Sequence, residues 1–282
     1  MKNLFLLLFV LIISTQIKAQ LELPRVSPKA SVSQTVGYCN ITVEYYRPAV
    51  KGRDIWGALV PFGQIWRTGA NDATTIQFTT NVSINGMSVP AGMYSLFTIP
   101  EKDEWTIILN KTFKQWGSYN YKSDDDLLRF TVKPVVSEFN ERLLFSFTEV
   151  SDSTATLSMS WDKLKVSFSI KEDIYKHAHQ KIKDALSQNP DKADIHNLAV
   201  RYAADNSIFL DEAAGWADKA VSLGGGYVSH FQKARVLYAS KNYVDALKSL
   251  AKCRETGRNE KNYQSFVSQI DFLEKQINSA MK

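Results

Sequence analysis

Histidine is scarce in this sequence and is missing from its first half. The 282 residues contain four histidines, at His177, His179, His196 and His230. Residues 1–170 therefore cannot build the usual histidine-dependent serine or cysteine triad, and no serine stands in a G-x-S-x-G turn. His177 and His179 are two residues apart on a predicted helix, so their side chains point away from each other and cannot share a metal ion. We expect neither a metal site nor a cofactor.

Cysteine is scarcer still, with Cys39 and Cys253 alone. They fall in what we predict below to be different domains. A disulfide between them would need close, correctly aimed positions in an oxidising compartment. We favour two buried thiols.

A concentrated basic surface is also missing. Residues 20–170 carry fifteen Lys or Arg and fifteen Asp or Glu, and residues 171–282 carry seventeen and fourteen. Neither half has the basic excess that binding to a phosphate backbone requires. We therefore expect no nucleic-acid partner.

Long apolar runs are absent after the N-terminus. Lys2 precedes an apolar run over residues 4–13, and the small residue Ala19 follows, which together are typical of a cleaved secretory signal at residues 1–19. The run is about half the length that a membrane-spanning helix needs, although an uncleaved anchor helix is the alternative. Gln20 rather than cysteine follows the expected cleavage point, which argues against a lipid anchor. We predict a secreted or periplasmic protein without a membrane span in its mature chain.

Residues 20–170 consist of short runs rich in β-branched and aromatic residues. Turn signals separate them about every eight to twelve residues; Asn85-Gly86 is the strongest hairpin signal, and Asp162-Lys163 is a further turn. Five of the six tryptophans and seven of the eight prolines lie in this half. The pattern predicts an all-β antiparallel sandwich of about nine or ten strands.

From residue 171 the apolar period changes from two to nearly four, which predicts an all-α domain at residues 171–282. Six helices are expected, over residues 174–186, 191–204, 210–223, 228–240, 243–253 and 263–281. Glu212-Ala213 recurs as Asp245-Ala246, thirty-three residues later, an interval typical of a helix-turn-helix repeat. This half resembles the tetratricopeptide repeats, whose packing positions are matched by Ala234, Leu237, Tyr238, Tyr243, Ala246 and Leu250, although Lys241 replaces the usual turn glycine. The resemblance implies a short helical repeat that offers a groove to a protein or peptide partner.

The first half carries a specific combination of short motifs. They are Ser27-Pro28-Lys29-Ala30, Tyr45-Tyr46-Arg47-Pro48, Val50-Lys51-Gly52-Arg53, Leu59-Val60-Pro61-Phe62-Gly63, Trp66-Arg67-Thr68-Gly69-Ala70-Asn71, residues 90–100, Trp105-Thr106 and Gln115-Trp116-Gly117. In these motifs residues 25–170 resemble a secreted bacterial family known as domain of unknown function 2911. The resemblance implies a secreted β-rich domain, often followed by tetratricopeptide-like helices, and it implies no established activity.

The stretch from Arg47 to Thr75 is too irregular for a strand and too apolar for an idle loop. In the interpretation that we favour, its tryptophans plug one end of the sandwich and its arginines satisfy buried carbonyls or carboxylates. In the other, it forms a pocket where arginine forks bind an anionic or carbohydrate ligand and an aromatic face stacks on a ring. The candidate ligand-binding residues are Arg47, Arg53, Arg67, Asn71, Trp56, Trp66 and, from a second aromatic loop, Trp116.

Acidic residues provide the remaining candidates. Asp124-Asp125-Asp126 lacks the alternating spacing and the glycine of a calcium loop, so we interpret it as a solvated acidic turn. A glycosidase needs two carboxylates facing each other across a cleft. Glu44, Asp54 and Asp72 lie near the irregular stretch, but no spacing singles out a pair.

These observations favour a non-catalytic binding protein of the secreted or periplasmic space. We expect an anionic or carbohydrate ligand at the β-domain and a protein or peptide partner at the helical repeat. The alternative is an envelope glycan or peptide hydrolase that uses acidic residues near Arg47 to Asn71.

Overall fold

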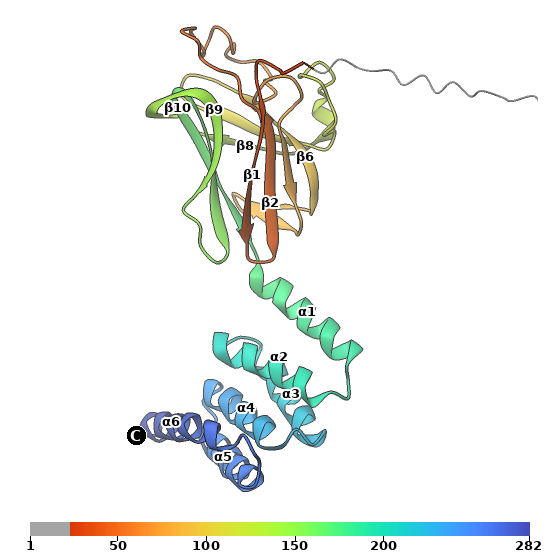
Figure 1. The fold of residues 1–282 in the computed structure, drawn as a ribbon, viewed down its shortest axis with the longest axis vertical. Helices are drawn as coiled ribbons and strands as arrows, with labels where there is room; N and C mark the ends of the chain where they lie inside the picture. The colour runs from red at the N-terminus through yellow and green to blue at the C-terminus, as the bar shows by residue number, and fades with distance from the viewer. Residues whose placement is uncertain (1–22) are drawn as a thin grey trace, which may run out of the picture. The chain divides into compact units, whose positions relative to one another are not determined.

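The computed structural model describes residues 23–282. These residues form two compact units that divide between Glu172 and Asp173. The first is built of strands and the second of helices (Figure 1). The signal peptide expected at residues 1–19 lies outside the described residues. No helix within residues 23–282 is long and apolar enough to cross a membrane.

The first unit is an antiparallel β-sandwich (Figure 1). One sheet has six strands in the order β1-β2-β3-β6-β7-β8, and the other has four in the order β5-β4-β10-β9. The predicted sandwich of nine or ten strands is therefore confirmed. The strands are β1 (Lys29–Val36), β2 (Cys39–Tyr46), β3 (Thr75–Phe78), β4 (Val82–Ile84), β5 (Met87–Val89), β6 (Gly92–Ile99), β7 (Trp105–Asn110), β8 (Asp126–Val132), β9 (Val135–Thr148) and β10 (Thr154–Glu172).

The main core lies between the two sheets and follows from the alternation of the strands. In β2, Cys39, Ile41, Val43 and Tyr45 are buried, while the residues between them are partly or fully exposed. Tyr45 joins the sheets, because its ring packs edge-on against Phe145 of β9 at 4.8 Å and its hydroxyl accepts the backbone N–H of Phe145 at 3.1 Å.

The outer face of β6 and β7 is also buried. All five residues from Tyr94 to Thr98 are buried. On the outer side Phe97 and Ile108 form a small second core with Ala73, and Ile65 and Tyr121 pack against it. Irregular segments before β3 and after β7 therefore lie against the large sheet, which fixes the loops from which the candidate sites are built.

Both turn predictions within the small sheet agree with the structure. Asn85 and Gly86 have φ values of 50° and 78°, the left-handed pair that a tight turn between β4 and β5 requires. Asp162, at φ 52°, lies midway along β10. The Oγ atoms of Ser158 and Ser167 are 2.8 Å apart, so the two halves of β10 lie side by side, as two strands joined by a turn would.

The second unit contains six helices within the described residues, as predicted. They are α1 (Ile174–Gln188), α2 (Ala193–Asn206), α3 (Leu210–Ser222), α4 (Gly226–Ala239), α5 (Tyr243–Gly257) and α6 (Gln264–Ala280). Side chains cap two of them: Asp173 accepts the Lys176 N–H at the start of α1, and Asn242 accepts the Asp245 N–H at the start of α5.

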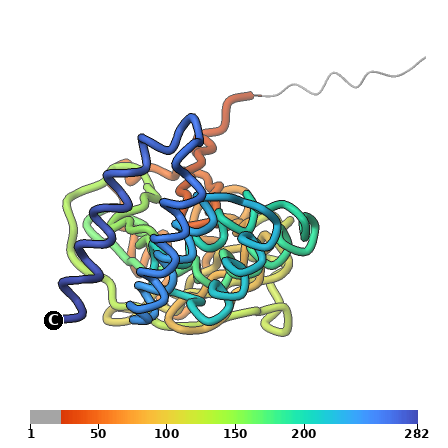
Figure 2. The backbone as a smooth tube through the Cα atoms, turned by 90° about the horizontal axis from the view of Figure 1, so that it is seen from below, coloured from red at the N-terminus to blue at the C-terminus, as the bar shows by residue number. Residues whose placement is uncertain are grey.

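Consecutive helices pack on one another, and the sequence repeat has a structural counterpart. Helix α2 packs against α3 and α4, α4 against α5, and α5 against α6 (Figure 2). Ala213 of α3 and Ala246 of α5, thirty-three residues apart, are both fully buried at 0 % exposure. A methyl side chain at each position lets neighbouring helices approach closely, so the two pairs α2/α3 and α4/α5 are built alike.

Both cysteines are free, buried thiols, the arrangement favoured from the sequence. Cys39 begins β2 and Cys253 lies in α5, so each unit contains one. Burial raises the pKa of Cys253 to about 11.

Candidate functional site

Four tryptophans form a compact cluster within the core of the β unit. The Trp56 ring lies 5.8 Å from Trp66, 4.7 Å from Trp105 and 5.7 Å from Trp161, measured between ring centroids. Trp66 stacks on Trp161 with an interplanar angle of 18°. The indole N–H of Trp66 donates to the Gly69 carbonyl at 3.1 Å. Two of the candidate ligand-binding residues, Trp56 and Trp66, are thus packing residues at the end of the core.

Two of the three candidate arginines bond to backbone carbonyls. Arg47 Nε donates to the Leu143 carbonyl of β9 at 2.8 Å. Arg53 Nε and Nη2 donate to the carbonyls of Val50 and Ala49 at 3.0 and 2.5 Å. Arg47 therefore ties the irregular stretch to the small sheet, and Arg53 closes its own turn.

Arg67 differs from both. Its side chain is half-buried, and its Nε atom is fully buried without a hydrogen-bond partner among the described residues. Burial lowers the pKa of the guanidinium, and Tyr119 opposes that shift. Within residues 23–282, no carboxylate lies within ion-pair distance of Arg67.

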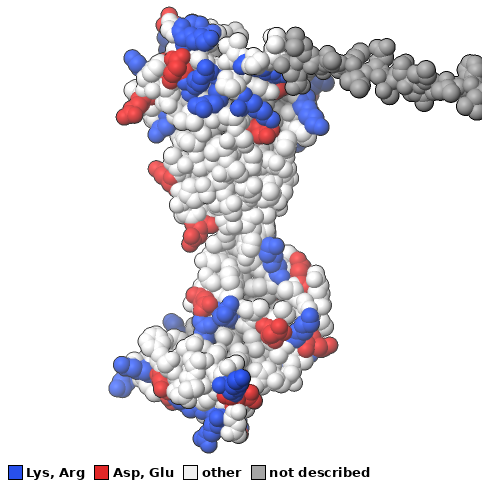
Figure 3. All heavy atoms as spheres, in the orientation of Figure 1, with Lys and Arg blue, Asp and Glu red and all other residues white. Residues whose placement is uncertain are grey.

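Arg67 lines a cavity of about 280 Å³ that we call the Arg67 pocket. Its cationic residues are Lys51, Arg53 and Arg67, and no Asp or Glu lines it. Trp66 and Trp161, the stacked pair, form its apolar wall together with Pro48, Leu59 and Val60. On the face that Figure 3 shows, Lys and Arg side chains gather at the loop end of this unit, with Asp and Glu side chains among them, and the flanks of the strands are largely uncharged. The pocket therefore combines positive charge with an aromatic surface.

The backbone around this pocket is held in an unusual conformation. Lys51, Thr68 and Asn71 have φ values of 49°, 55° and 57°, a region that side-chain-bearing residues rarely adopt. Thr68 is β-branched and buried, and it is held in place because its carbonyl accepts the Thr74 hydroxyl at 2.8 Å. Left-handed residues of this kind cluster at functional sites, where the surrounding structure enforces them.

A second cavity, of about 340 Å³, is lined in part by Asp72 and Ala73; we call it the Trp116 cleft. Its walls include Tyr46 of β2, Asp72, and Gln115 and Trp116 from the loop after β7. Asp72 and Trp116 form an antiparallel bridge. Burial raises the pKa of Tyr46, and the Asp72 carboxylate raises it further.

The three carboxylates considered for hydrolysis are divided by the fold. Glu44 and Asp72 both line the Trp116 cleft, whereas Asp54 lines neither cavity. Glu44 pairs with Lys29 at 3.0 Å, and Asp72 pairs with Arg25 at 3.6 Å. The structure thus brings two acidic side chains to one cleft and gives each a basic neighbour.

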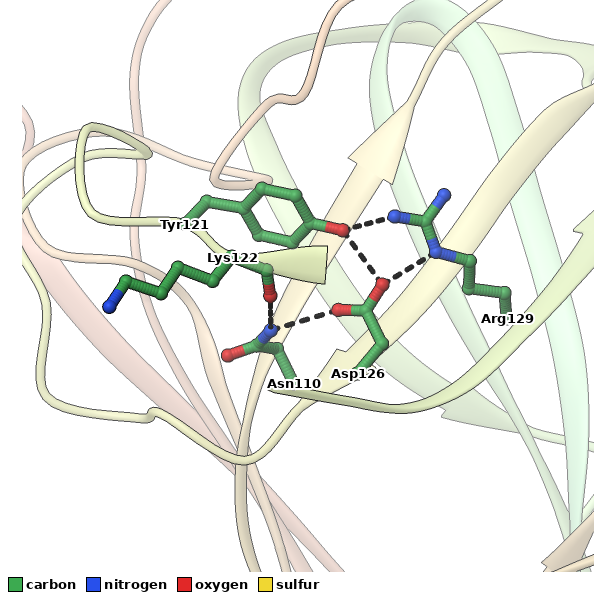
Figure 4. Close-up of polar contacts among 5 residues, drawn as sticks. All are labelled: Asn110, Tyr121, Lys122, Asp126 and Arg129. Carbon is green, nitrogen blue, oxygen red and sulfur yellow. Dashed lines mark hydrogen bonds and ion pairs between the residues drawn. The ribbon is translucent and has the colours of Figure 1, made fainter. Parts of the chain in front are cut away.

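A polar network fixes the loop that carries Trp116 (Figure 4). Asp126 accepts hydrogen bonds from the Tyr121 hydroxyl at 2.7 Å, from Arg129 Nε at 2.5 Å and from Asn110 Nδ2 at 2.8 Å. Arg129 also donates to the Tyr121 oxygen, and Asn110 donates to the Lys122 carbonyl at 3.0 Å. Burial and the Asp126 carboxylate raise the pKa of Tyr121 to about 12, against the opposing charge of Arg129.

The interpretation of residues 124–126 as a solvated acidic turn is therefore wrong for Asp126. Its side chain is 8 % exposed and belongs to the network above, because Arg129, three residues further along β8, folds back onto it. No group of three or more His, Cys, Asp or Glu side chains within the described chain is arranged to hold a metal ion.

The remaining candidates are Asn71 and Trp116. Asn71 Nδ2 donates to the Ser27 carbonyl at 3.4 Å, and the Asn71 carbonyl accepts the Gly117 N–H at 3.0 Å. Trp116 is 53 % exposed and lines only the Trp116 cleft. Of the seven predicted site residues, Arg53, Arg67 and Trp66 meet at one pocket and Trp116 lies at the other. The three that line neither are Arg47, Trp56 and Asn71.

Among the residues that sequence reasoning missed are Lys51, Gln115 and Trp161, which line these cavities, and Arg25, which lies against Trp116. Lys51 and Gln115 stand within the motifs quoted above, so a signal for them was present. Trp161 comes from the far end of the domain, and nothing local to it marks a site.

The helical unit has a cavity of its own, of about 330 Å³, between α3, α4 and α5. Its charged residues are paired: Lys233 Nζ of α4 lies 2.6 Å from Asp218 of α3, and within α5 Lys248 Nζ lies 2.8 Å from Asp245. Val236 and Leu237 supply its apolar part.

Comparison with known protein families gives one match. The family described as "Protein of unknown function (DUF2911)" matches residues 27–170. The chain belongs to this family. The match covers the β-sandwich up to residue 170 and every lining residue of its two cavities except Val26, so the resemblance of the β half is confirmed. No curated protein and no solved structure matches the chain.

Proposed function

We propose that this DUF2911 protein is a non-catalytic binding protein whose β unit takes a small organic anion in the Arg67 pocket. The observation that carries the proposal is the state of Arg67, a half-buried guanidinium with a fully buried, unpartnered Nε in a cavity lined by three cationic residues and no acidic one.

Electrostatics supports this proposal. A buried charge without a counter-charge is costly, so proteins normally pair it. Arg47 and Arg53 show how this chain satisfies an arginine for structural purposes, with backbone carbonyls. Arg67 has no such arrangement, which favours a counter-charge that comes from outside the chain.

The lining also limits the chemistry of the ligand. A guanidinium fork matches the planar geometry of a carboxylate, and the Trp66 and Trp161 wall suits an apolar or ring-shaped body. A cavity of about 280 Å³ is close to the lower end of the range for small-molecule sites, roughly 300 Å³. We therefore propose a carboxylate on a single ring, such as an aromatic acid or a sugar acid.

Matched ligand pairs test the proposal. Mature protein (residues 20–282) is titrated calorimetrically with benzoate and benzamide, and with glucuronate and glucose. We expect binding of an acid and none of its neutral partner. Arg67→Gln should weaken binding of the acid roughly ten- to hundredfold, which corresponds to the free energy of one hydrogen bond to a charged group.

Arg201→Gln is the control, because it removes the same charge from an exposed position of α2. Equal binding of acids and neutral partners, or equal affinity of Arg67→Gln and wild type, would show that the pocket is not an anion site. Mass spectrometry of envelope polysaccharides and peptides after incubation with the mature protein tests the hydrolase alternative: cleavage that is lost in Glu44→Gln or Asp72→Asn would support it.

We also propose that the helical unit is a short tetratricopeptide-like array with a peptide partner. The thirty-three-residue repeat, the matched buried alanines and the cavity between α3, α4 and α5 support this. Capture from an envelope extract by mature wild-type protein and by Lys233→Glu/Lys248→Glu protein provides the test, with Lys261→Glu as the control. Identical bound proteins in all three samples would contradict a peptide groove.

We also propose that the protein is secreted or periplasmic after its signal peptide is cleaved. Cleavage after Ala19 is supported by the charge and apolar pattern of the first residues. Protein expressed from the whole gene should begin at Gln20 when its N-terminus is sequenced. An intact N-terminus in the cytoplasmic fraction would contradict this.

A further inference from the structure

A positively charged side chain of the protein itself lies against three of the residues that line the Trp116 cleft. Arg25, which precedes β1, places its guanidinium carbon 5.2 Å from the centroid of the Tyr46 ring and 5.4 Å from that of Trp116. Its Nη1 lies 3.6 Å from Asp72 Oδ2. Two aromatic faces and one carboxylate therefore contact one guanidinium, which is the combination of groups that recognises organic cations.

The contact that Arg25 makes is weak. Both members of its ion pair have side chains that are 48 % exposed, and an exposed pair at this separation contributes little because water screens it. Residues 23–25 lie outside the strands, so no sheet pairing holds Arg25 in place. A competing cation can replace it without breaking the fold.

The cleft also has room and an unused acceptor. It measures about 340 Å³, and Arg25 is not one of its lining residues, so the guanidinium lies at its edge and does not fill it. Gln115, at its wall, is 7 % exposed, and its Oε1 has no hydrogen-bond partner among residues 23–282. Its Nε2 already donates to the Thr112 carbonyl at 2.5 Å, so the amide is fixed in orientation.

The charges around the cleft fit a ligand with one cationic group. Lys29 neutralises Glu44, and Lys114, with its Nζ 5.9 Å from the Phe113 ring centroid, is the remaining basic residue of the wall. Asp72 is thus the carboxylate that a ligand can share or take over from Arg25.

We propose that Tyr46, Trp116 and Asp72, at the edge of the Trp116 cleft, form a binding site for a guanidinium group, as in an arginine side chain of a peptide, and that Arg25 occupies this site in cis. Tyr46 and Trp116 stack on the guanidinium plane, and Asp72 accepts its N–H groups. Ligand and Arg25 compete, so Arg25 lowers the affinity of the site.

Removal of the internal competitor provides the test. N-acetylarginine amide and its neutral isostere N-acetylcitrulline amide are titrated into mature wild-type protein and into Arg25→Ala by calorimetry. We expect Arg25→Ala to bind the arginine compound roughly three- to tenfold more tightly than wild type, and neither protein to bind the citrulline compound. Asp72→Asn and Trp116→Ala, each combined with Arg25→Ala, should lose the binding.

Two further measurements keep the outcome unambiguous. Melting curves establish that each variant is folded, and Arg67→Gln should bind the arginine compound as wild type does, which separates this site from the Arg67 pocket. The proposal is overturned if Arg25→Ala fails to bind the arginine compound, binds the citrulline compound equally well, or binds as tightly without Asp72 and Trp116.

Discussion

Tyr121 donates its hydroxyl to Asp126 Oδ2 over 2.7 Å, and this bond joins the end of the aromatic loop to the first residue of β8. The same carboxylate bonds to Asn110 of β7 and Arg129 of β8. The Asp126 carboxylate therefore anchors the C-terminal end of the loop that presents Trp116.

Tyr121→Phe should destabilise the β unit by about 1–2 kcal/mol, because it removes a hydrogen bond to a charged group. The substitution should also change how the free energy of unfolding depends on pH in alkaline solution. The pKa of Tyr121 is about 12 in the folded protein and about 10 in an unfolded chain. The stability that the folded protein gains from this raised pKa is therefore complete below about pH 10 and is lost as the pH rises toward 12.

Urea unfolding between pH 8 and 12, followed by tryptophan fluorescence, measures this effect. Tyr46 and Tyr94 also have raised pKa values, so their ionisation lowers the stability of the wild type in the same pH range. The quantity to compare is therefore the difference in the free energy of unfolding between wild type and Tyr121→Phe at each pH. Parallel curves for the two proteins across that range would contradict the assignment.

Arg67→Met should leave stability unchanged or raise it by up to about 1 kcal/mol, since it removes a half-buried charge that lacks a counter-charge and keeps the apolar stem. Arg47→Met is the matched comparison. It should lower stability by about 1–3 kcal/mol, because the buried carbonyl of Leu143 loses its donor. Thermal melts of the two variants check the contrast, and a large loss in Arg67→Met would mean that Arg67 is a structural residue.

Lys241→Gly should stabilise the helical unit by about 0.5–1 kcal/mol. Lys241 follows the end of α4 at φ 61°, and Asn242 N–H donates back to the Leu237 carbonyl at 2.8 Å, so the position is the left-handed one that glycine fills at helix ends. Melting followed by circular dichroism at 222 nm measures the gain. Lys241→Ala, which keeps a β-carbon there, should not show it.

Ala246→Leu should destabilise the helical unit by about 1–3 kcal/mol, because α4 and α5 meet at this fully buried methyl group. Val244→Leu, two residues earlier and 55 % exposed, should stay within about 0.5 kcal/mol of wild type. Similar melting temperatures for both variants would show that the helices do not cross closely at Ala246.

Much of the fold could be predicted because its signals are local. Alternation in β2, the Asn85-Gly86 pair and the change of period near residue 171 each depend on neighbouring residues. The bounds of β10 are an exception, since its two halves form one continuous stretch of strand although Asp162 turns the chain between them.

The candidate sites were harder to predict, because their chemistry depends on which distant groups reach a side chain. The carbonyl that satisfies Arg47 lies ninety-six residues away, and no pattern within the irregular stretch separates Arg47 from Arg67. The sequence also did not show that Glu44 and Asp72 line the same cleft, because β2 and the segment before β3 meet only in the folded sheet.

The two buried cysteines have a practical consequence. Each compact unit contains one thiol, so neither unit can form an internal cross-link, and its folding does not wait for an oxidant. Recombinant chain made in the reducing cytoplasm of a bacterial host should therefore be equivalent to chain exported to an oxidising space. Reductant can be present throughout purification without loss of structure.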